Sequence, residues 1–149
     1  MKRNISENIP VLIVEDDPER QSILKNLFRS HAWILAHTAD RAIRLIKAYR
    51  FAMVSLDYDL AGSGKGVDVA QVLADTENRD AYVLIHSMNG PGAEKIQQLL
   101  PRAVWVPINQ ITKTHAVFKR LRAEIVHVPD IDWKNVFGKD KTVESEDTE

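Results

Sequence analysis

Short apolar runs alternate with segments of helical spacing along most of the chain, and this alternation constrains the fold more than any other feature. Runs of four or five residues that are rich in β-branched or aromatic side chains predict strands. The runs are VLIV (11–14), AMVSL (52–56), YVLI (82–85) and AVWV (103–106), with a weaker and less buried run, WILAH (33–37), between the first two. Each is followed by a segment of helical spacing, so the predicted order is strand then helix, five times over.

The segments that follow these runs predict five helices. Asp17 is a candidate N-cap with Pro18 in the first helical position, and this helix is expected to end near His31. Thr38 is a candidate cap of the second helix, whose inward face is expected to include Tyr49. The third helix is expected to carry Val69, Ala70, Val72 and Leu73, the fourth to open at Pro91, and the fifth to follow Thr112 or Thr114.

Strict alternation of strands and helices favours parallel strands joined by right-handed helical crossovers. The predicted fold class is therefore α/β, a doubly wound five-stranded parallel sheet with helices on both faces. This domain is expected to span residues 9–128, after a polar extension at 1–8. An extension at 129–149 follows, with an acidic tail that is expected to be disordered. Trp133 and Phe137 in this extension are expected to pack back onto the domain.

Composition excludes several classes of function. The chain of 149 residues contains no cysteine, so disulfides, thiolate zinc sites and cysteine nucleophiles are ruled out. Its net charge of −1 argues against a general DNA or RNA binder, because such proteins are usually strongly basic. No apolar run approaches the roughly 20 residues of a membrane-spanning helix, so we expect a cytoplasmic protein without membrane contacts.

In a doubly wound fold, ligands bind beyond the carboxyl ends of the strands, so the residues that follow each run are the functional candidates. Carboxylates gathered there repel one another, and a hard cation or a raised pKa relieves the repulsion. Magnesium, or manganese, suits such a site because it binds carboxylates together with phosphate oxygens. The candidates are Glu15, Asp16, Asp57 and Asp59 as metal ligands, and His86, Ser87 and Asn89 after the fourth strand.

Some of these residues have a structural interpretation as well. Asp17 is favoured as a helix cap rather than as a ligand. Asp59 either binds metal or starts the turn into AGSGKG. His86 either transfers protons or is a packed residue, because period-two alternation turns it to the face opposite Ile85 and Ser87.

The segment VLIVEDDPER, an apolar strand followed by acids, proline and a helix, resembles the opening of two-component receiver domains. The resemblance covers most of the chain and implies the flavodoxin-like (βα)5 receiver fold. It implies that Glu15, Asp16 and Asp57 bind magnesium, and that Asp57 accepts a phosphoryl group from a histidine kinase. It also implies that Ser87 is the hydroxyl residue that responds to the phosphoryl group.

The sequence departs from ordinary receivers at several positions. Receivers carry a lysine before the proline that follows the fifth strand, whereas this chain has Val106 there, and Lys65 and Lys113 are candidate substitutes. The motifs SLDYDL, GVDVA and IHSMN instead resemble a divergent branch, the cyclic-phosphate processing receiver domains. That resemblance implies action on a cyclic phosphate, in a small molecule or at the end of an RNA.

Two hypotheses on function follow, and the sequence leaves both open. In the first, the domain is a metal-dependent enzyme that opens a cyclic phosphate, with His86 transferring the proton and Ser87 and Asn89 orienting the phosphate oxygens. Asp57 is either a metal ligand or the nucleophile in this reaction. In the second, the domain is a response-regulator receiver or pseudo-receiver that a histidine kinase phosphorylates at Asp57 and that signals to an effector protein.

Overall fold

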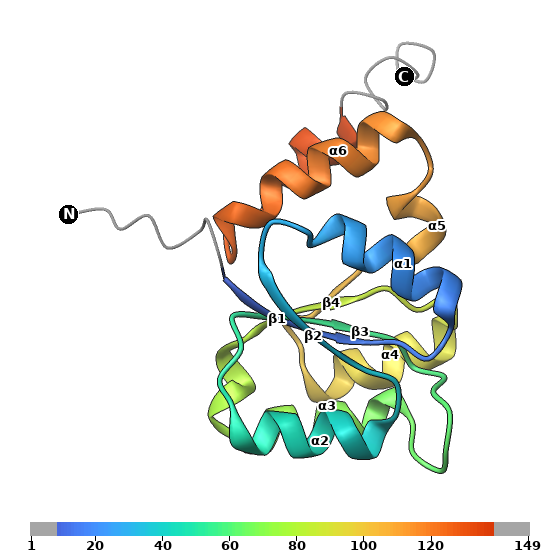
Figure 1. Ribbon diagram of the computed structural model, residues 1–149, viewed down its shortest axis with the longest axis vertical. Coiled ribbons are helices and arrows are strands. Elements are labelled where there is room, and N and C mark those ends of the chain that lie inside the picture. Colours follow the sequence, from blue (N-terminus) through green and yellow to red (C-terminus); the bar gives the residue numbers. More distant parts are fainter. Residues whose placement is uncertain (1–8, 139–149) are drawn as a thin grey trace, which may run out of the picture.

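Five parallel strands form one sheet, in the order β2-β1-β3-β4-β5, in the computed structural model, which describes residues 9–138 (Figure 1). Every neighbouring pair of strands is parallel. The prediction of a doubly wound five-stranded parallel sheet is therefore confirmed. The strands are β1 (Pro10–Val14), β2 (Ala32–Ala36), β3 (Met53–Leu56), β4 (Tyr82–Ile85) and β5 (Val104–Trp105).

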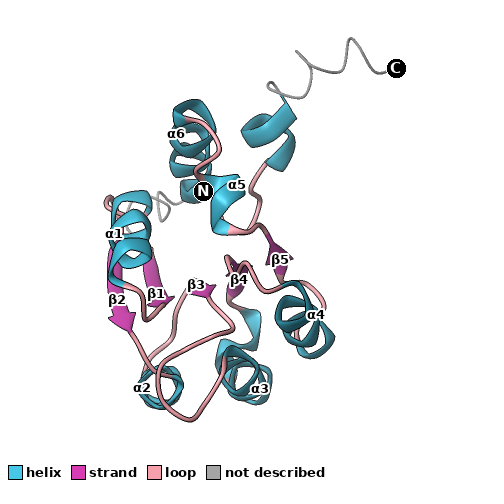
Figure 2. Cartoon of the chain, turned by 90° about the vertical axis from the view of Figure 1, so that its right-hand side faces the viewer, coloured by secondary structure: helices cyan, strands magenta, loops and turns pink. Residues whose placement is uncertain are grey.

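Helices cover both faces of the sheet. Seen along the strands, α1, α5 and α6 lie on one side and α2, α3 and α4 on the other (Figure 2). The labelled helices are α1 (Pro18–Leu27), α2 (Ala39–Ala48), α3 (Gly66–Asp75), α4 (Gly90–Leu99), α5 (Ile108–Ile111) and α6 (His115–Glu124), with short 3-10 helices η2 (Glu77–Asp80) and η3 (Ile125–His127). Residues 133–138 are helical as well. None of the helices within residues 9–138 has the length and apolar character that crossing a bilayer requires.

The strands divide the core into two apolar clusters because successive side chains point to opposite faces of the sheet. On the side of α2, α3 and α4, the sheet contributes Leu12, Val14, Val54, Leu56 and Ile85. On the side of α1 and α6, it contributes Val11, Ile13, Met53 and Leu84, and Val106 follows directly after β5. Both clusters lie between a helical layer and the sheet, so the central strands β1, β3 and β4 are buried from both sides and their ends are firmly positioned.

Local capping explains most of the helix starts. Asp17 caps α1 by accepting a hydrogen bond from the backbone of Arg20 at 3.0 Å, and Thr38 caps α2 through Arg41 at 3.1 Å, so both predicted caps are confirmed. Thr114 caps α6 in the same way. Helix α4 begins one residue before Pro91, at Gly90.

Two expectations about the helices were wrong. Helix α1 ends at Leu27 rather than near His31, because His31 turns back to accept a hydrogen bond from the backbone of Ile9 at 3.3 Å. Tyr49 does not face the core: it is 58% exposed and has extended backbone after the end of α2. The expected fifth helix is confirmed as α6, which follows Thr114, whereas the short helix α5 before Thr112 was not predicted.

Part of the C-terminal extension packs on the side of the sheet that α1 and α6 cover. The indole nitrogen of Trp133 donates a hydrogen bond to the hydroxyl of Tyr82 at 2.9 Å, and its ring stacks on Phe137 with 6.0 Å between centroids. Val136 is fully buried. The expected packing of Trp133 and Phe137 is confirmed, whereas the acidic tail lies outside the described residues.

We expect Gly66→Ala to destabilise the domain by about 2–4 kcal/mol. Gly66 opens α3 directly beside the end of β3, and a Cβ there would overlap the backbone carbonyl oxygen of Asp57. Chemical denaturation measures the change in the free energy of unfolding. Gly90→Ala is the matched control, because its Cβ would lie 3.5 Å from the ring of Trp105, an ordinary contact. Equal stability of the two variants would contradict the expectation.

Candidate functional site

The carboxyl ends of β1, β3 and β4 bring three polar side chains together. Glu15, Asp57 and His86 each continue the alternating series that points toward α1, after Ile13, Met53 and Leu84 respectively. One ligand atom from each of the three polar residues lies within 4.8 Å of the others, and all three side chains are buried. The sheet therefore places two carboxylates and an imidazole in one pocket beneath α1.

Glu15 is the fully buried centre of this pocket. Its Oε1 is 2.8 Å from Nε2 of His86, while its Oε2 accepts hydrogen bonds from the backbone of Asp17 at 3.0 Å and from Arg20 at 3.0 Å. Burial alone would raise the pKa of Glu15, but hydrogen bonds from His86 and Arg20 outweigh it and lower the pKa from 4.5 to about 2. Glu15 is thus a carboxylate that stays ionised.

His86 is fully buried and both of its ring nitrogens are bonded. Nδ1 lies 2.8 Å from the hydroxyl of Ser55, and Nε2 bonds to Glu15. Because the ionised carboxylate only accepts hydrogen bonds, Nε2 of His86 is the donor to Glu15. Alternation does turn His86 to the face of the sheet opposite Ile85, as the sequence indicates. That face is the one on which Glu15 lies.

Asp57 is a buried carboxylate with fewer compensating contacts. Its Oδ1 accepts a hydrogen bond from the backbone of Tyr58 at 2.8 Å, and Ser87 donates a second bond to its side chain. Burial is the main reason that the pKa of Asp57 is raised. His86 and Ser87 pull the pKa down, and the charge of Glu15 adds to the rise. A cation beside Asp57 would stabilise its ionised form and lower its pKa.

The guanidinium of Arg20 supplies such a cation in this structure. Its Nη2 lies 3.0 Å from Oε2 of Glu15, 3.6 Å from Oδ2 of Asp57 and 3.9 Å from Oδ1 of Asp16. Arg20 was not among the residues predicted from the sequence, because it lies in the first turn of a helix rather than at a strand end. The signal was present in the four-residue spacing from Asp16 to Arg20 at the start of a helix, which brings the two side chains to one face.

The lysine candidates do not reach the buried carboxylates. Lys65 lies 3.9 Å from Asp59, and no ion pair within residues 9–138 joins Lys113 to Glu15, Asp16 or Asp57. Val106, at the position where receivers carry lysine, is 8% exposed and packs in the apolar cluster beneath α1 and α6.

Asp59 and Asn89 contact each other at the outer edge of the pocket. The amide nitrogen of Asn89 donates to Asp59 at 3.1 Å, and its amide oxygen caps α4 by accepting from the backbone of Gly92 at 2.9 Å. The Asp59 side chain is 60% exposed. Ser87, in contrast, is buried, and its hydroxyl accepts the backbone hydrogen of Asn89 at 3.0 Å. The pocket therefore has a buried inner part and a solvated rim.

The donor set suits a divalent oxygen-binding cation. Three carboxylates, from Glu15, Asp16 and Asp57, already converge on one positive group, and hard carboxylate oxygens are what magnesium binds. His86 fits the role of a partner that orients a ligating carboxylate, since its Nε2 is bonded to Glu15.

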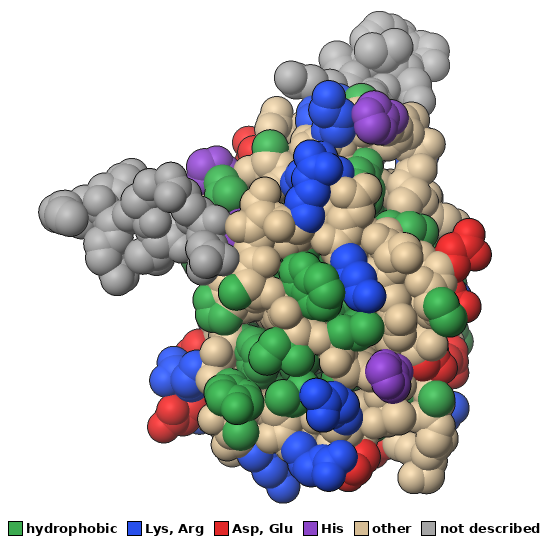
Figure 3. All heavy atoms as spheres, viewed as in Figure 1, with side chains coloured by type: hydrophobic (Ala, Val, Ile, Leu, Met, Phe, Trp, Pro, Cys, Tyr) green, Lys and Arg blue, Asp and Glu red, His purple; other side chains and the backbone are tan. Residues whose placement is uncertain are grey.

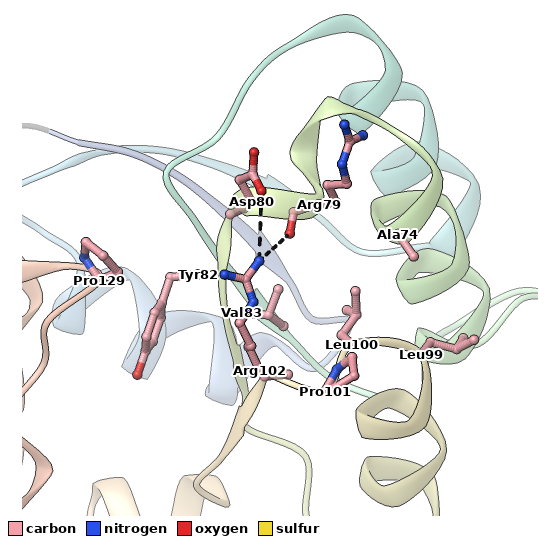
Figure 4. Close-up of a pocket in the computed structure, with 12 residues that line it drawn as sticks. Ala74, Arg79, Asp80, Tyr82, Val83, Leu99, Leu100, Pro101, Arg102 and Pro129 are labelled. Atoms are coloured by element: carbon pink, nitrogen blue, oxygen red, sulfur yellow. Dashed lines mark hydrogen bonds and ion pairs between the residues drawn. The ribbon is translucent and has the colours of Figure 1, made fainter.

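A separate cavity of about 460 Å³ lies at the other end of the sheet (Figure 4). It is lined by the start of β4, including Tyr82, and by Pro101 after α4. The guanidinium of Arg102 lies at this cavity, 3.8 Å from the carboxylate of Asp80. Because none of the acidic pocket residues lines it, this cavity is not part of the candidate site.

The fold has close structural relatives among receiver domains. The non-phosphorylated receiver domain of HemR from Leptospira biflexa is 25% identical, with a TM-score of 0.63, and the match covers 81% of this chain and 95% of that one. The response regulator TrrA from Thermotoga maritima, solved with Mg²⁺-BeF, is 17% identical with a TM-score of 0.59, over 76% of this chain and 98% of its own.

A third relative is the receiver domain of a sensor histidine kinase from Pseudomonas aeruginosa PAO1, solved with a magnesium ion in its active-site cleft. It is 17% identical with a TM-score of 0.60, over 80% of this chain and 98% of that one. No curated protein matches the chain. Residues 11–102, more than half of the chain, match the family described as the cyclic-phosphate processing receiver domain. The chain therefore has the receiver fold and belongs to the cyclic-phosphate processing receiver domain family.

Proposed function

We propose that this domain uses a magnesium ion in the acidic pocket to hydrolyse a cyclic phosphodiester. The observation that carries the proposal is the convergence of Glu15, Asp16 and Asp57 on a single cation, beside the buried hydroxyl of Ser87. Membership of the cyclic-phosphate processing receiver family supports the substrate class. Magnesium in the cleft of the Pseudomonas aeruginosa receiver supports the choice of metal.

The residues that would hold the ion are Glu15, Asp16 and Asp57, with Asp59 as a further ligand at the rim. The bound ion would neutralise phosphate charge and lower the pKa of a bound water. Ser87 and Asn89 would donate hydrogen bonds to phosphate oxygens. Both side chains lie at the start of α4, the end of a helix that favours anions.

The reaction adds one water across one P–O ester bond. The water oxygen forms a bond to phosphorus, one ring ester bond breaks, and the leaving oxygen takes up a proton, so the product is a phosphomonoester with a free hydroxyl. His86 would assist the proton transfer. Because its Nε2 is bonded to Glu15 and its ring is buried, it would act through Glu15 rather than by touching the substrate.

A screen of the purified protein against a panel of cyclic phosphates tests this function. The panel contains cyclic mononucleotides, cyclic dinucleotides and RNA with a terminal 2′,3′-cyclic phosphate, each with magnesium and with EDTA. We expect magnesium-dependent ring opening of at least one member, followed by ³¹P NMR. The small-molecule and RNA arms distinguish the two substrate sources, and no turnover in any arm would reject the proposal.

We expect His86→Ala to bind magnesium about tenfold more weakly, because Glu15 loses an orienting partner. At saturating magnesium we expect hydrolysis to fall by about 10²–10⁴-fold, the range for a lost proton-transfer group. Ser55→Ala is the matched control, because it removes only the partner of Nδ1 and leaves the bond to Glu15. The pH dependence of kcat separates the roles: a role in proton transfer predicts a changed profile in His86→Ala. Wild-type turnover with an unchanged profile would show that His86 is structural.

A second function is favoured by the neighbourhood of Asp57. A buried carboxylate hydrogen-bonded by Ser87, in a receiver fold, supports an acceptor for a phosphoryl group from a histidine kinase, with an effector protein as the partner. The buried Val106 argues against phosphorylation at Asp57, because it occupies the position where receivers carry a lysine. Magnesium-dependent beryllofluoride binding that is lost in Asp57→Asn, together with no turnover of cyclic phosphates, would favour this signalling function.

A further inference from the structure

We propose that Arg20 is the phosphate-binding cation of the pocket, and that Glu15, Asp16 and Asp57 hold its guanidinium until a divalent ion displaces the guanidinium from them. This inference rests on the proposed function only in that the pocket receives a phosphate group. It adds a residue with a defined role, and it predicts competition between two cations for one set of carboxylates.

The start of α1 is a firm base for the Arg20 side chain. The backbone N–H of Arg20 donates to Asp17 at 3.0 Å, and the backbone N–H of Asp17 donates to Glu15 at 3.0 Å. The side-chain amide of Gln21 donates to the backbone carbonyl of Glu15 at 2.8 Å. The first turn of the helix is thereby bound to the end of β1. This places the Arg20 side chain beside the carboxylates of Glu15 and Asp57.

The contacts of Arg20 differ from those of a surface ion pair. Its side chain is 37% exposed, whereas those of Glu15 and Asp57 are 0% and 6% exposed, so the guanidinium lies between buried carboxylates and solvent. Arg44 and Asp40 have the same four-residue spacing on α2, but their side chains are 70% and 81% exposed, so water screens the pair. The Arg20 cluster is therefore a site rather than a solvated pair.

The charges of the cluster predict the exchange. Three carboxylates and one guanidinium leave a net charge of −2, which equals in size the charge of one magnesium ion. The ion and the guanidinium would compete for the same oxygen atoms of Glu15, Asp16 and Asp57 and repel each other. When the ion binds, the guanidinium is released toward solvent, where its planar set of donors matches two oxygens of a phosphate.

No other cation of the described chain is placed for this role. Within residues 9–138, Arg20 is the one lysine or arginine that pairs with Glu15, Asp16 or Asp57. Lys65 lies at the rim, where its Nζ is 3.9 Å from the exposed Asp59. An anion that enters the inner pocket therefore meets either the metal or Arg20.

Two titrations of Arg20→Met test the proposal. Calorimetry with magnesium alone is expected to show a Kd that falls about tenfold, because the competing charge is gone. ³¹P NMR with inorganic phosphate at saturating magnesium is expected to show a Kd that rises at least about tenfold, because the anion loses its partner. Arg20→Lys is expected to lie between wild type and Arg20→Met, and Arg44→Met, the matched control, to behave as wild type.

The outcomes separate this inference from the proposed function. Unchanged phosphate binding in Arg20→Met would overturn the phosphate-binding role, and unchanged magnesium affinity would overturn the exchange, whether or not the wild type turns over cyclic phosphates. A wild type that opens no cyclic phosphate but loses phosphate binding in Arg20→Met would reject the hydrolase and support Arg20. Absence of magnesium-dependent phosphate binding in the wild type would overturn both.

Discussion

Glu15→Ala is expected to destabilise the domain by about 3–5 kcal/mol at neutral pH, the cost of removing one partner from a buried charged pair. The change leaves His86 Nε2 and the backbone of Asp17 without their acceptor and removes a contact of Arg20. Urea denaturation at pH 7 measures it. Glu94→Ala, at an exposed position of α4, is the matched control and is expected to change stability by less than about 0.5 kcal/mol.

The same variant gives a prediction about pH. The pKa of Glu15 is lowered from 4.5 to about 2 in the fold, so its ionised form stabilises the native state above pH 4.5, and this stabilisation is lost as the pH falls toward 2. A lowering of this size corresponds to roughly 3 kcal/mol at about 1.4 kcal/mol per pKa unit. The difference between wild type and Glu15→Ala should therefore shrink between pH 4.5 and 2. A constant difference over that range would contradict the assignment.

Asp57→Asn is expected to abolish magnesium binding and to lower turnover by at least about 10³-fold, since it removes the carboxylate that both proposed functions share. Unlike Glu15→Ala, Asp57→Asn is expected to stabilise the metal-free protein. The raised pKa of Asp57 means that its ionised form is disfavoured in the fold, so removing the charge at pH 7 should stabilise the metal-free protein. We expect a rise in Tm of about 2–4 °C, the shift that ~1 kcal/mol produces in a domain of this size.

Thermal denaturation with and without magnesium measures both effects of Asp57→Asn. Wild type should gain Tm as magnesium is added, whereas Asp57→Asn should start higher and gain nothing. Asp75→Asn, an exposed position at the end of α3, is the matched control and should respond to magnesium as wild type does. A normal magnesium response in Asp57→Asn would reject both the hydrolase and the phosphorylated receiver.

An exposed apolar surface accompanies the edge of the sheet. Hydrophobic side chains gather on the face seen in Figure 3, and Trp33 and Ile34 of the edge strand β2 are each 36% exposed. The ammonium of Lys25 lies 5.5 Å from the ring centre of Trp33. The weaker apolar run at 33–37 had predicted a less buried strand, and its position at the sheet edge explains why.

Much of the fold could be predicted because its signals are local. A buried strand needs a run of apolar residues, and a helix start needs a cap such as Asp17 or Thr38, so short stretches of sequence carry the information. Element ends were less predictable. The exposed position of Tyr49, whose carbonyl accepts a hydrogen bond from Asn78, and the short helix α5 depend on distant contacts and backbone turns that no apolar pattern records.

The sequence by itself determined the alternation of strands and helices, and hence which polar residues follow the strands. Only the tertiary structure decided which of them meet: it joined Glu15, Asp57 and His86 and left Asp59 at the rim. It also brought Arg20 from the first turn of α1 onto the buried carboxylates. The physical reason is that strand patterns arise from neighbours in sequence, whereas a charged site arises from residues that the order of the strands and the packing of α1 bring together.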